Sequence, residues 1–141
     1  MPFEILMADD NPGDVRLTRE SLRDAQTPCN LRAVGDGTEA LAYLRREGRY
    51  ADAPRPDLVL IDLNMPRMDG HELLSEMKND PNLRRIPVVI LTHSEEARDV
   101  YEAYDRHANS YVVKPVHFEH FAHVMKSVEQ FWLTTSTLPP T

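Results

Sequence analysis

The sequence predicts a single α/β domain, built as a doubly wound, five-stranded parallel sheet with five flanking helices. Its length of 141 residues suits one domain whose core is large enough to fold unaided. Short apolar runs alternate along the chain with segments in which apolar residues recur at helical spacing. Because parallel strands need crossover connections of about a dozen residues, usually helical, this alternation indicates a parallel sheet covered on both faces.

The expected strands are continuous apolar runs, which are typical of strands buried on both faces. In chain order they are residues 5–8, 31–34, 58–61, 88–91 and 111–113. The expected helices lie at residues 15–25, 40–44, 73–77, 97–104 and 118–132. The last helix is expected to run to residue 133, so that the domain covers 1–133 and a loosely ordered tail covers 134–141.

Two helix starts are visible in the sequence. Asn11 and Pro12 form a cap and a first-turn proline ahead of the first helical segment. Asp69 and Gly70 are typical of a turn and a helix cap, and Gly70 permits a close approach of another chain segment.

Composition excludes several classes of protein. The net charge of −7 leaves no basic stripe for binding nucleic acid. The single cysteine, Cys29, rules out an internal disulfide framework and is expected to be an inert, partly buried thiol. No apolar segment approaches the roughly 20 residues that span a bilayer, and no signal peptide is apparent, so a cytoplasmic location without membrane partners is expected.

Polar residues follow the expected strands. Asp9 and Asp10 follow the first strand, Asp62 the third, Thr92 the fourth and Lys114 the fifth. The carboxyl ends of parallel strands share one edge, where such folds bind ligands. Three carboxylates there would repel one another unless a cation lay among them, and oxygen ligands favour Mg²⁺. The alternative is that Asp9 and Asp10 only cap the first helix.

A carboxylate beside Mg²⁺ can attack a phosphoryl group and form an acyl phosphate. We therefore expect Asp62 to accept a phosphoryl group that Lys114 and Thr92 contact. Two alternatives share the architecture: a Mg²⁺-dependent aspartyl phosphatase and a flavin-binding electron carrier. Such phosphatases commonly carry a second Asp two residues after the nucleophile, where this chain has Asn64, and an acidic loop after the first strand would repel a flavin phosphate.

These strand-end residues and their spacing resemble the receiver domain of two-component response regulators over nearly the whole chain. The resemblance implies a flavodoxin-like sheet with strand order 2-1-3-4-5 and a signalling protein rather than an enzyme. It implies that Asp62 is the phosphoacceptor, and that Asp9, Asp10, Asp62 and the Asn64 carbonyl hold Mg²⁺. It also implies that the protein promotes its own Mg²⁺-dependent phosphorylation and dephosphorylation.

The resemblance assigns further roles near the phosphoacceptor. It implies a cis Lys114–Pro115 bond and a switch in which Tyr111 turns inward when Thr92 moves toward the phosphate. The alternative for Tyr111 is a strand tyrosine with a fixed hydroxyl partner. Asn64 and Ser94 are expected to tune dephosphorylation. His93 departs from the commonest pattern, where a small residue leaves the phosphoacceptor open, and it is expected to narrow access.

A narrower resemblance joins residues 11–18, 49–56, 107–111 and 131–133 to the single-domain regulators that serve bacterial and cyanobacterial phytochrome histidine kinases. It implies a phytochrome-type sensor kinase as partner, and a homodimer through the fourth helix, fifth strand and lengthened fifth helix. The expected dimer contacts are Tyr101, Tyr104, Phe131 and Trp132. The alternative is that these aromatic side chains pack on their own domain. His117, His120 and His123 recur every third residue, which suits surface positions better than one metal site.

Overall fold

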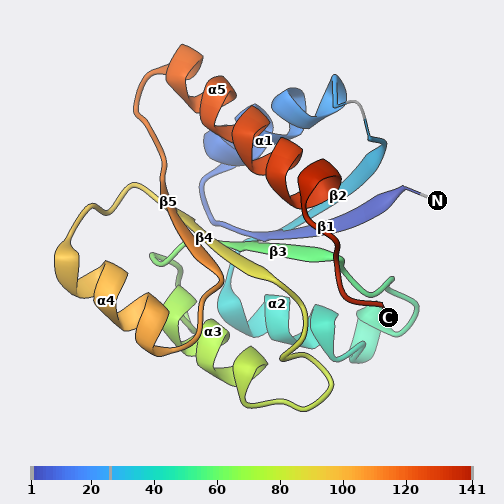
Figure 1. Ribbon diagram of the computed structural model, residues 1–141. Helices are drawn as coiled ribbons and strands as arrows, with labels where there is room; N and C mark the ends of the chain where they lie inside the picture. The colour runs from blue at the N-terminus through green and yellow to red at the C-terminus, as the bar shows by residue number, and fades with distance from the viewer. Residues whose placement is uncertain (1, 26, 141) are drawn as a thin grey trace.

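The computed structural model of the protein describes residues 2–25 and 27–140, and a five-stranded parallel sheet forms its centre (Figure 1). The strand order is β2-β1-β3-β4-β5, and each neighbouring pair is parallel. The strands are β1 (Phe3–Ala8), β2 (Cys29–Val34), β3 (Leu58–Ile61), β4 (Val88–Thr92) and β5 (Ser110–Val113). The predicted doubly wound sheet and its strand order are confirmed.

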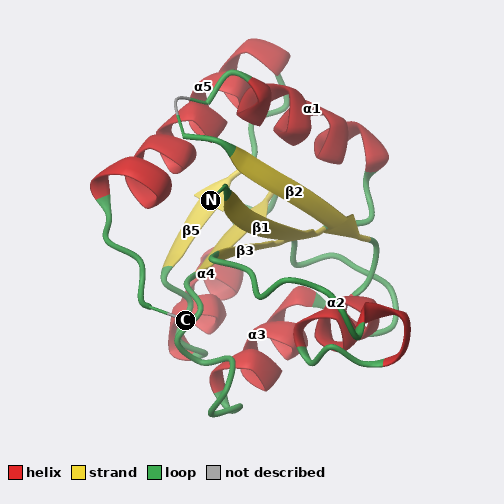
Figure 2. Ribbon diagram, turned by 90° about the vertical axis from the view of Figure 1, so that its right-hand side faces the viewer, coloured by secondary structure: helices red, strands yellow, loops and turns green. Residues whose placement is uncertain are grey.

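Helices cover both faces of the sheet. Their bounds are α1 (Pro12–Arg23), α2 (Gly37–Leu44), α3 (Gly70–Lys78), α4 (Ala97–Asp105) and α5 (Phe118–Glu129). Helices α1 and α5 lie together on one face, while α2, α3 and α4 lie on the other, as both views show (Figures 1 and 2). Each crossover therefore contains a helix, as parallel connections require.

The alternation of side chains along each strand explains the two layers of core. Successive strand residues point to opposite faces, so Leu6 and Ala8 pack with the α2–α3–α4 layer, whereas Ile5 and Met7 pack with α1 and α5. The three central strands are buried along most of their length, as their apolar runs predict. Strands β2 and β5 are only partly buried because each has a single neighbouring strand.

Helices α1, α2 and α3 start with side-chain caps at the edge of the sheet. The caps are Asn11, Asp36 and Asp69, each of which accepts main-chain hydrogen bonds from the first turn of its helix. Gly70 lets α3 begin close to β3, because a Cβ there would lie 2.4 Å from the Asp62 carbonyl oxygen. The cap at Asp69 and the close approach at Gly70 were predicted from the sequence and are confirmed.

The chain ends in a modified helical segment. A π-helix, Gln130–Thr135, continues α5 beyond residue 133, where the last helix was expected to end. Pro139 and Pro140 line a surface pocket with Pro56, so the tail lies beside the loop that precedes β3. The predicted tail includes Thr141, which falls outside the described residues, as do positions 1 and 26 of the predicted domain. Among the helices of the described ranges, none has the length and apolar character to cross a membrane.

Candidate functional site

Four strand ends bring predicted site residues to one edge of the sheet. Asp9 follows β1, Asp62 follows β3, Thr92 ends β4 and Lys114 follows β5. All four residues are buried. Direct hydrogen bonds join Asp62 to Thr92 and to Lys114, and Asp9 to Lys114. The juxtaposition that the sequence predicted for these side chains is therefore present.

Lys114 lies at the centre of the site. Its side chain is 0% exposed, and its Nζ lies 2.8 Å from an Oδ2 atom of each of Asp9, Asp14 and Asp62. Burial by itself lowers the pKa of Lys114, but hydrogen bonds to the three carboxylates outweigh burial and hold the pKa above its ordinary value. Lys114 is therefore charged, and the cation at the centre of these three carboxylates is its ammonium group.

The two oxygens of Asp62 have different partners. Oδ1 accepts a hydrogen bond from the Thr92 hydroxyl at 3.0 Å and from the Asn64 main-chain N–H at 3.2 Å. Oδ2 accepts a hydrogen bond from Lys114. The Asp62 side chain keeps 9% of its surface exposed, so it is reachable from outside the protein. A carboxylate held in this way has donors placed for the extra negative charge of a phosphoryl group.

The remaining acidic residues suit a hard cation. Burial raises the pKa of Asp9, and the nearby charge of Asp62 adds to that rise, although hydrogen bonds from Lys114 and from the Asn11 main chain oppose it. Asp10 is exposed and lines a surface pocket together with Asn64. The oxygen donors of Asp9, Asp10 and Asp62 match the preference of Mg²⁺ and similar divalent ions. Of the predicted metal ligands, Asp10 and Asn64 therefore line the open surface, while Asp9 and Asp62 are buried beside Lys114.

Asp14 is a site residue that sequence reasoning missed. It belongs to the first turn of α1, and its side chain, 12% exposed, reaches Lys114. Its Oδ2 atom also lies 3.1 Å from His93 Nε2. The buried positions of α1 are Asp14, Thr18 and Leu22, spaced four residues apart. A charged residue on this inward stripe was the signal that could have identified it, because charges are rarely buried without a partner.

In the loop after β4, His93 and Ser94 contact other elements, among them Tyr111 of β5. The ring of His93 lies between Asp14 and the Lys114 carbonyl oxygen, which Nδ1 approaches to 2.9 Å. The hydroxyl of Ser94 donates to Asp99 at 2.6 Å. The Tyr111 hydroxyl donates to the Ser94 carbonyl oxygen at 3.0 Å, and its ring packs against the core. Burial raises the pKa of Tyr111. Tyr111 thus has a defined hydroxyl partner and a packed ring in this structure.

The expected cis bond before Pro115 is wrong. Residues 2–25 and 27–140 contain no cis peptide bond, so Lys114–Pro115 is trans. The long lysine side chain reaches its three carboxylates from this backbone, while the Lys114 N–H donates to the Thr92 carbonyl oxygen. The trans form is also the lower in energy for most X–Pro bonds.

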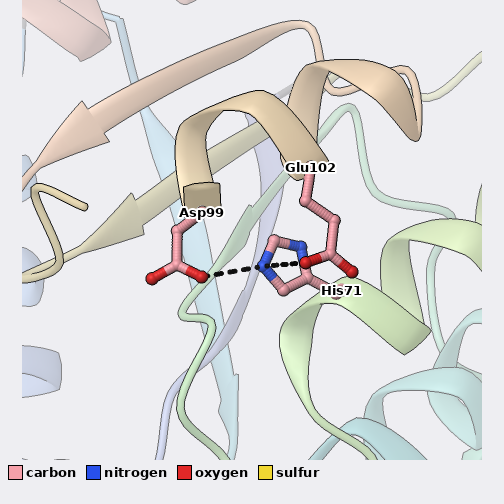
Figure 3. Close-up of side chains that lie close together, drawn as sticks. All are labelled: His71, Asp99 and Glu102. Carbon is pink, nitrogen blue, oxygen red and sulfur yellow. Dashed lines mark hydrogen bonds and ion pairs between the residues drawn. The ribbon is translucent and has the colours of Figure 1, made fainter. Parts of the chain in front are cut away.

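A second cluster of titratable groups connects α3 to α4 (Figure 3). His71 Nε2 lies 3.4 Å from Asp99 Oδ1 and 3.6 Å from Glu102 Oε2. His71 Nδ1 is buried without a hydrogen-bond partner in the described part of the chain. Metal-bound histidines almost always donate this second nitrogen to an acceptor, so the cluster fits an ion pair between helices better than a metal site.

The aromatic residues predicted at a dimer contact lie near the surface. Tyr101 is 75% exposed, Tyr104 49% and Phe131 52%, while Trp132 is partly buried against the core and stacks edge-on with Phe131. Helix α4 and the helix that the π-helical segment continues, α5, lie on opposite faces of the sheet (Figures 1 and 2). His117, His120 and His123, at the start of α5 and along it, are exposed, as the sequence predicts.

Comparisons with known proteins identify the family. The response regulator receiver domain matches residues 5–126. The chain is 41% identical to response regulator Rcp1 of Synechocystis sp., over 98% of this chain and 94% of Rcp1. The crystal structure of the phosphorylated cyanobacterial phytochrome response regulator RcpA superimposes with a TM-score of 0.96 at 46% identity, covering 99% of this chain and 100% of that one.

The Mn²⁺-bound form of Rcp1 superimposes with a TM-score of 0.95 at 41% identity, covering 99% of this chain and 100% of that structure. Phosphorylation on an aspartate is the general function of receiver domains. The acidic edge of the sheet, the buried Lys114 and these matches agree with one another. The chain belongs to the response regulator receiver domain family.

Proposed function

We propose that this response regulator is a cytoplasmic phosphorylation switch in which Asp62 accepts a phosphoryl group from the phosphohistidine of a sensor kinase. The observation that carries the proposal is the surroundings of Asp62. A hydroxyl, a main-chain N–H and a buried ammonium all donate to its oxygens. These donors are placed where negative charge accumulates during phosphoryl transfer.

In the transfer step, a carboxylate oxygen of Asp62 attacks phosphorus. The new O–P bond forms as the N–P bond of phosphohistidine breaks, and the bonding electron pair leaves with the imidazole nitrogen. Lys114 then moves one N–H from Asp62 to a phosphoryl oxygen, and the Thr92 hydroxyl donates to another. Both groups already contact Asp62, so the rearrangement needed is small.

Mg²⁺ is the proposed cofactor, held by the carboxylates of Asp9, Asp10 and Asp62 and the carbonyl of Asn64. When bound, it neutralises charge on the phosphoryl oxygens. Asp9 provides support from this structure, because burial and Asp62 raise its pKa and a cation would relieve that penalty. Hydrolysis of the acyl phosphate is proposed to be slow and intrinsic, with Asn64 and Ser94 beside the path of the attacking water.

The proposed partner is a phytochrome-type histidine kinase. Support comes from the relatives, since RcpA is described as a cyanobacterial phytochrome response regulator and a further similar structure as a regulator in red light signalling of R. palustris. The chain is 36% identical to the latter, with a TM-score of 0.90.

The proposed output is a change in the surface of α4, β5 and α5, together with homodimerisation. Thr92 and Tyr111 connect the phosphoacceptor to this surface, because Tyr111 bonds the loop that follows Thr92. Exposed aromatic groups on α4 and at the end of α5 supply apolar area for a second copy. The domain is proposed to include the π-helix, Gln130–Thr135, with the residues after it as a tail.

The test uses purified protein, Mg²⁺ and ³²P-labelled acetyl phosphate. We expect one alkali-labile, hydroxylamine-sensitive label per chain in the wild type and none in Asp62→Asn, which preserves shape but removes the nucleophile. Asp52→Asn is a matched control, because Asp52 is an exposed acid in the loop before β3. An unlabelled wild type, or a labelled Asp62→Asn, would refute the proposal. Transfer from a phosphorylated phytochrome kinase, compared with an unrelated kinase, tests the partner separately.

A further inference from the structure

Asp14 and His93 both contact Lys114, and the proposed function assigns a role to neither residue. Asp14 lies on α1, His93 on the loop after β4, and Lys114 on the loop after β5. Asp14 Oδ2 lies 2.8 Å from Lys114 Nζ and 3.1 Å from His93 Nε2. His93 Nδ1 lies 2.9 Å from the Lys114 carbonyl oxygen. Asp14 therefore contacts the ammonium of the lysine, and His93 contacts its main chain.

The ammonium of Lys114 uses all of its donors. It has three N–H groups and three carboxylate partners, each at 2.8 Å. Its side chain is 0% exposed, so water does not replace a missing partner without reorganisation. Asp9 and Asp62 lie on the side of the predicted metal site, whereas Asp14 approaches from α1. Asp14 is therefore the partner that belongs neither to the phosphoacceptor nor to the metal ligands.

His93 holds Asp14 in this position. The Lys114 carbonyl oxygen can only accept a hydrogen bond, so His93 Nδ1 donates to it. Nε2 lies 3.1 Å from a carboxylate oxygen of Asp14, so the ring connects the Lys114 main chain to Asp14 and restricts where the Asp14 side chain can lie.

The phosphoryl-transfer step depends on the orientation of the Lys114 ammonium. Lys114 must release Asp62 and turn that N–H toward a phosphoryl oxygen. With two N–H groups held by Asp9 and Asp14, the tetrahedral ammonium has only one direction for the third. With Asp9 alone, the ammonium rotates about a single hydrogen bond and the third N–H is no longer aimed. Such loss of orientation slows a reaction that depends on positioned charge.

We propose that Asp14 is a positioning residue for phosphoryl transfer, aiming the Lys114 ammonium at the phosphoryl group, and that His93 acts by holding Asp14. This inference rests on the proposed function, because it assigns Lys114 the phosphoryl contact. It reverses the sequence-based expectation for His93. A ring that narrows access slows phosphorylation and its removal accelerates the reaction, whereas a ring that holds Asp14 supports the reaction and its removal slows it.

The experiment measures the rate constant of phosphorylation by acetyl phosphate at saturating Mg²⁺, with the Mg²⁺ dissociation constant and the melting temperature of each variant. Asp14→Asn is expected to phosphorylate about tenfold more slowly, the order expected when a charged hydrogen bond is lost from the transition state, with little change in Mg²⁺ affinity. His93→Ala is expected to be slower by about threefold. Glu129→Gln is the matched control, because Glu129 is a buried acid on α5, and it should keep the wild-type rate.

A double-mutant cycle separates positioning from a general structural effect. In a Lys114→Ala background, Asp14→Asn should cause no further decrease, because the lysine that it positions is gone. A wild-type rate in Asp14→Asn, an equal decrease in both backgrounds, or a faster His93→Ala would each overturn the inference. If Asp14→Asn fails to fold, the rate of His93→Ala still tests the inference. The His93 side chain is 43% exposed, so its truncation should not prevent folding. Failure of the proposed function is distinct, because the wild type itself would then carry no label on Asp62.

Discussion

Lys114 illustrates how single residues determine the chemistry of the site. An isolated buried ammonium is strongly unfavourable, and here three carboxylates compensate it. The same contacts hold the Asp62 carboxylate in place beside the Thr92 hydroxyl. These contacts therefore keep one carboxylate of the cluster oriented and reachable, which is what a phosphoryl acceptor requires.

Asp10 provides a prediction about the metal. It is exposed and makes no side-chain hydrogen bond among the described residues, so Asp10→Asn should leave the free energy of unfolding in EDTA within about 0.5 kcal/mol of the wild type. In Mg²⁺ the wild type should gain melting temperature, because the ion binds only the folded site. Asp10→Asn should lose most of that gain.

Thermal unfolding with EDTA and with increasing Mg²⁺ measures both effects. Asp24→Asn, a change at the end of α1 away from the strand edge, is the control and should respond to Mg²⁺ like the wild type. An unchanged Mg²⁺ response in Asp10→Asn would exclude Asp10 as a ligand.

At the scale of elements, the close approach of Gly70 to the end of β3 sets the distance between α3 and the strand that precedes Asp62. A Cβ on Gly70 would lie 2.4 Å from the Asp62 carbonyl oxygen and 2.7 Å from the Leu63 Cα, and backbone atoms cannot move aside cheaply. Gly70→Ala should therefore destabilise the protein by about 2 kcal/mol or more and slow phosphorylation of Asp62. Urea unfolding and acetyl phosphate labelling measure the two effects.

Gly35→Ala is the matched control for Gly70, because a Cβ at Gly35 meets no atom within 4 Å. It should leave stability and labelling close to the wild type. Equal behaviour of the two alanine variants would show that the contact between α3 and β3 does not constrain the site.

The start of α4 is held by a charged hydrogen bond. The Ser94 hydroxyl lowers the pKa of Asp99, to which it donates at 2.6 Å, and His71 adds to this effect. A carboxyl with a lower pKa in the folded state stabilises the fold at neutral pH, and this contribution disappears as the pH falls through that folded pKa. Ser94→Ala should thus reduce stability by about 1 kcal/mol at neutral pH and by less in strong acid.

Urea unfolding at several pH values measures the difference between Ser94→Ala and the wild type. Ser127→Ala is the control, since the Ser127 hydroxyl is exposed and donates to the His123 carbonyl within α5. Its effect should be small and independent of pH. A Ser94→Ala deficit that stays constant into acid would mean that Asp99 is not the group stabilised.

The helices and strands could be predicted from the sequence, because the spacing of apolar residues and the helix caps are local properties of the chain. Apolar runs located all five strands, and Asn11 and Asp69 marked helix starts. Three features depend on tertiary contacts and were not predicted correctly. Asp14 joins the site only when α1 lies on the sheet, the Lys114–Pro115 bond is trans, and a π-helix extends α5 past the expected end.

At the scale of the whole molecule, the sheet separates two surfaces. Helices α1 and α5 lie on one face and α2, α3 and α4 on the other (Figure 2). Asp62, the proposed phosphoacceptor, follows β3 at the carboxyl edge of the sheet between these layers. Asp62 accepts hydrogen bonds from Thr92, whose following loop contacts α4 through Ser94 and Asp99, and from Lys114, which lies in the loop before α5. The proposed output surface therefore includes elements from both layers.

Homodimerisation is a prediction about the whole molecule. Tyr101 is 75% exposed on α4 and Phe131 52% exposed at the end of α5, and a stable dimer buries roughly 1,200–2,000 Å² in total. Because α4 and the end of α5 lie apart, one interface includes both only if it runs along the whole α4–β5–α5 side. Tyr101→Asp and Phe131→Asp should then each raise the dimer dissociation constant by about tenfold or more, since buried aromatic anchors dominate interface energy.

Sedimentation equilibrium with and without beryllofluoride measures the dissociation constants. Phe118→Asp is the matched control, because Phe118 is 63% exposed and lines a groove with Glu20 and Asp24 on the α1 side of α5. It should dimerise like the wild type. A wild type that remains monomeric in both conditions would refute the dimer, whereas weakening by Phe131→Asp alone would confine the interface to the end of α5. The second outcome would leave α4 free to present the phosphorylation state to a different partner.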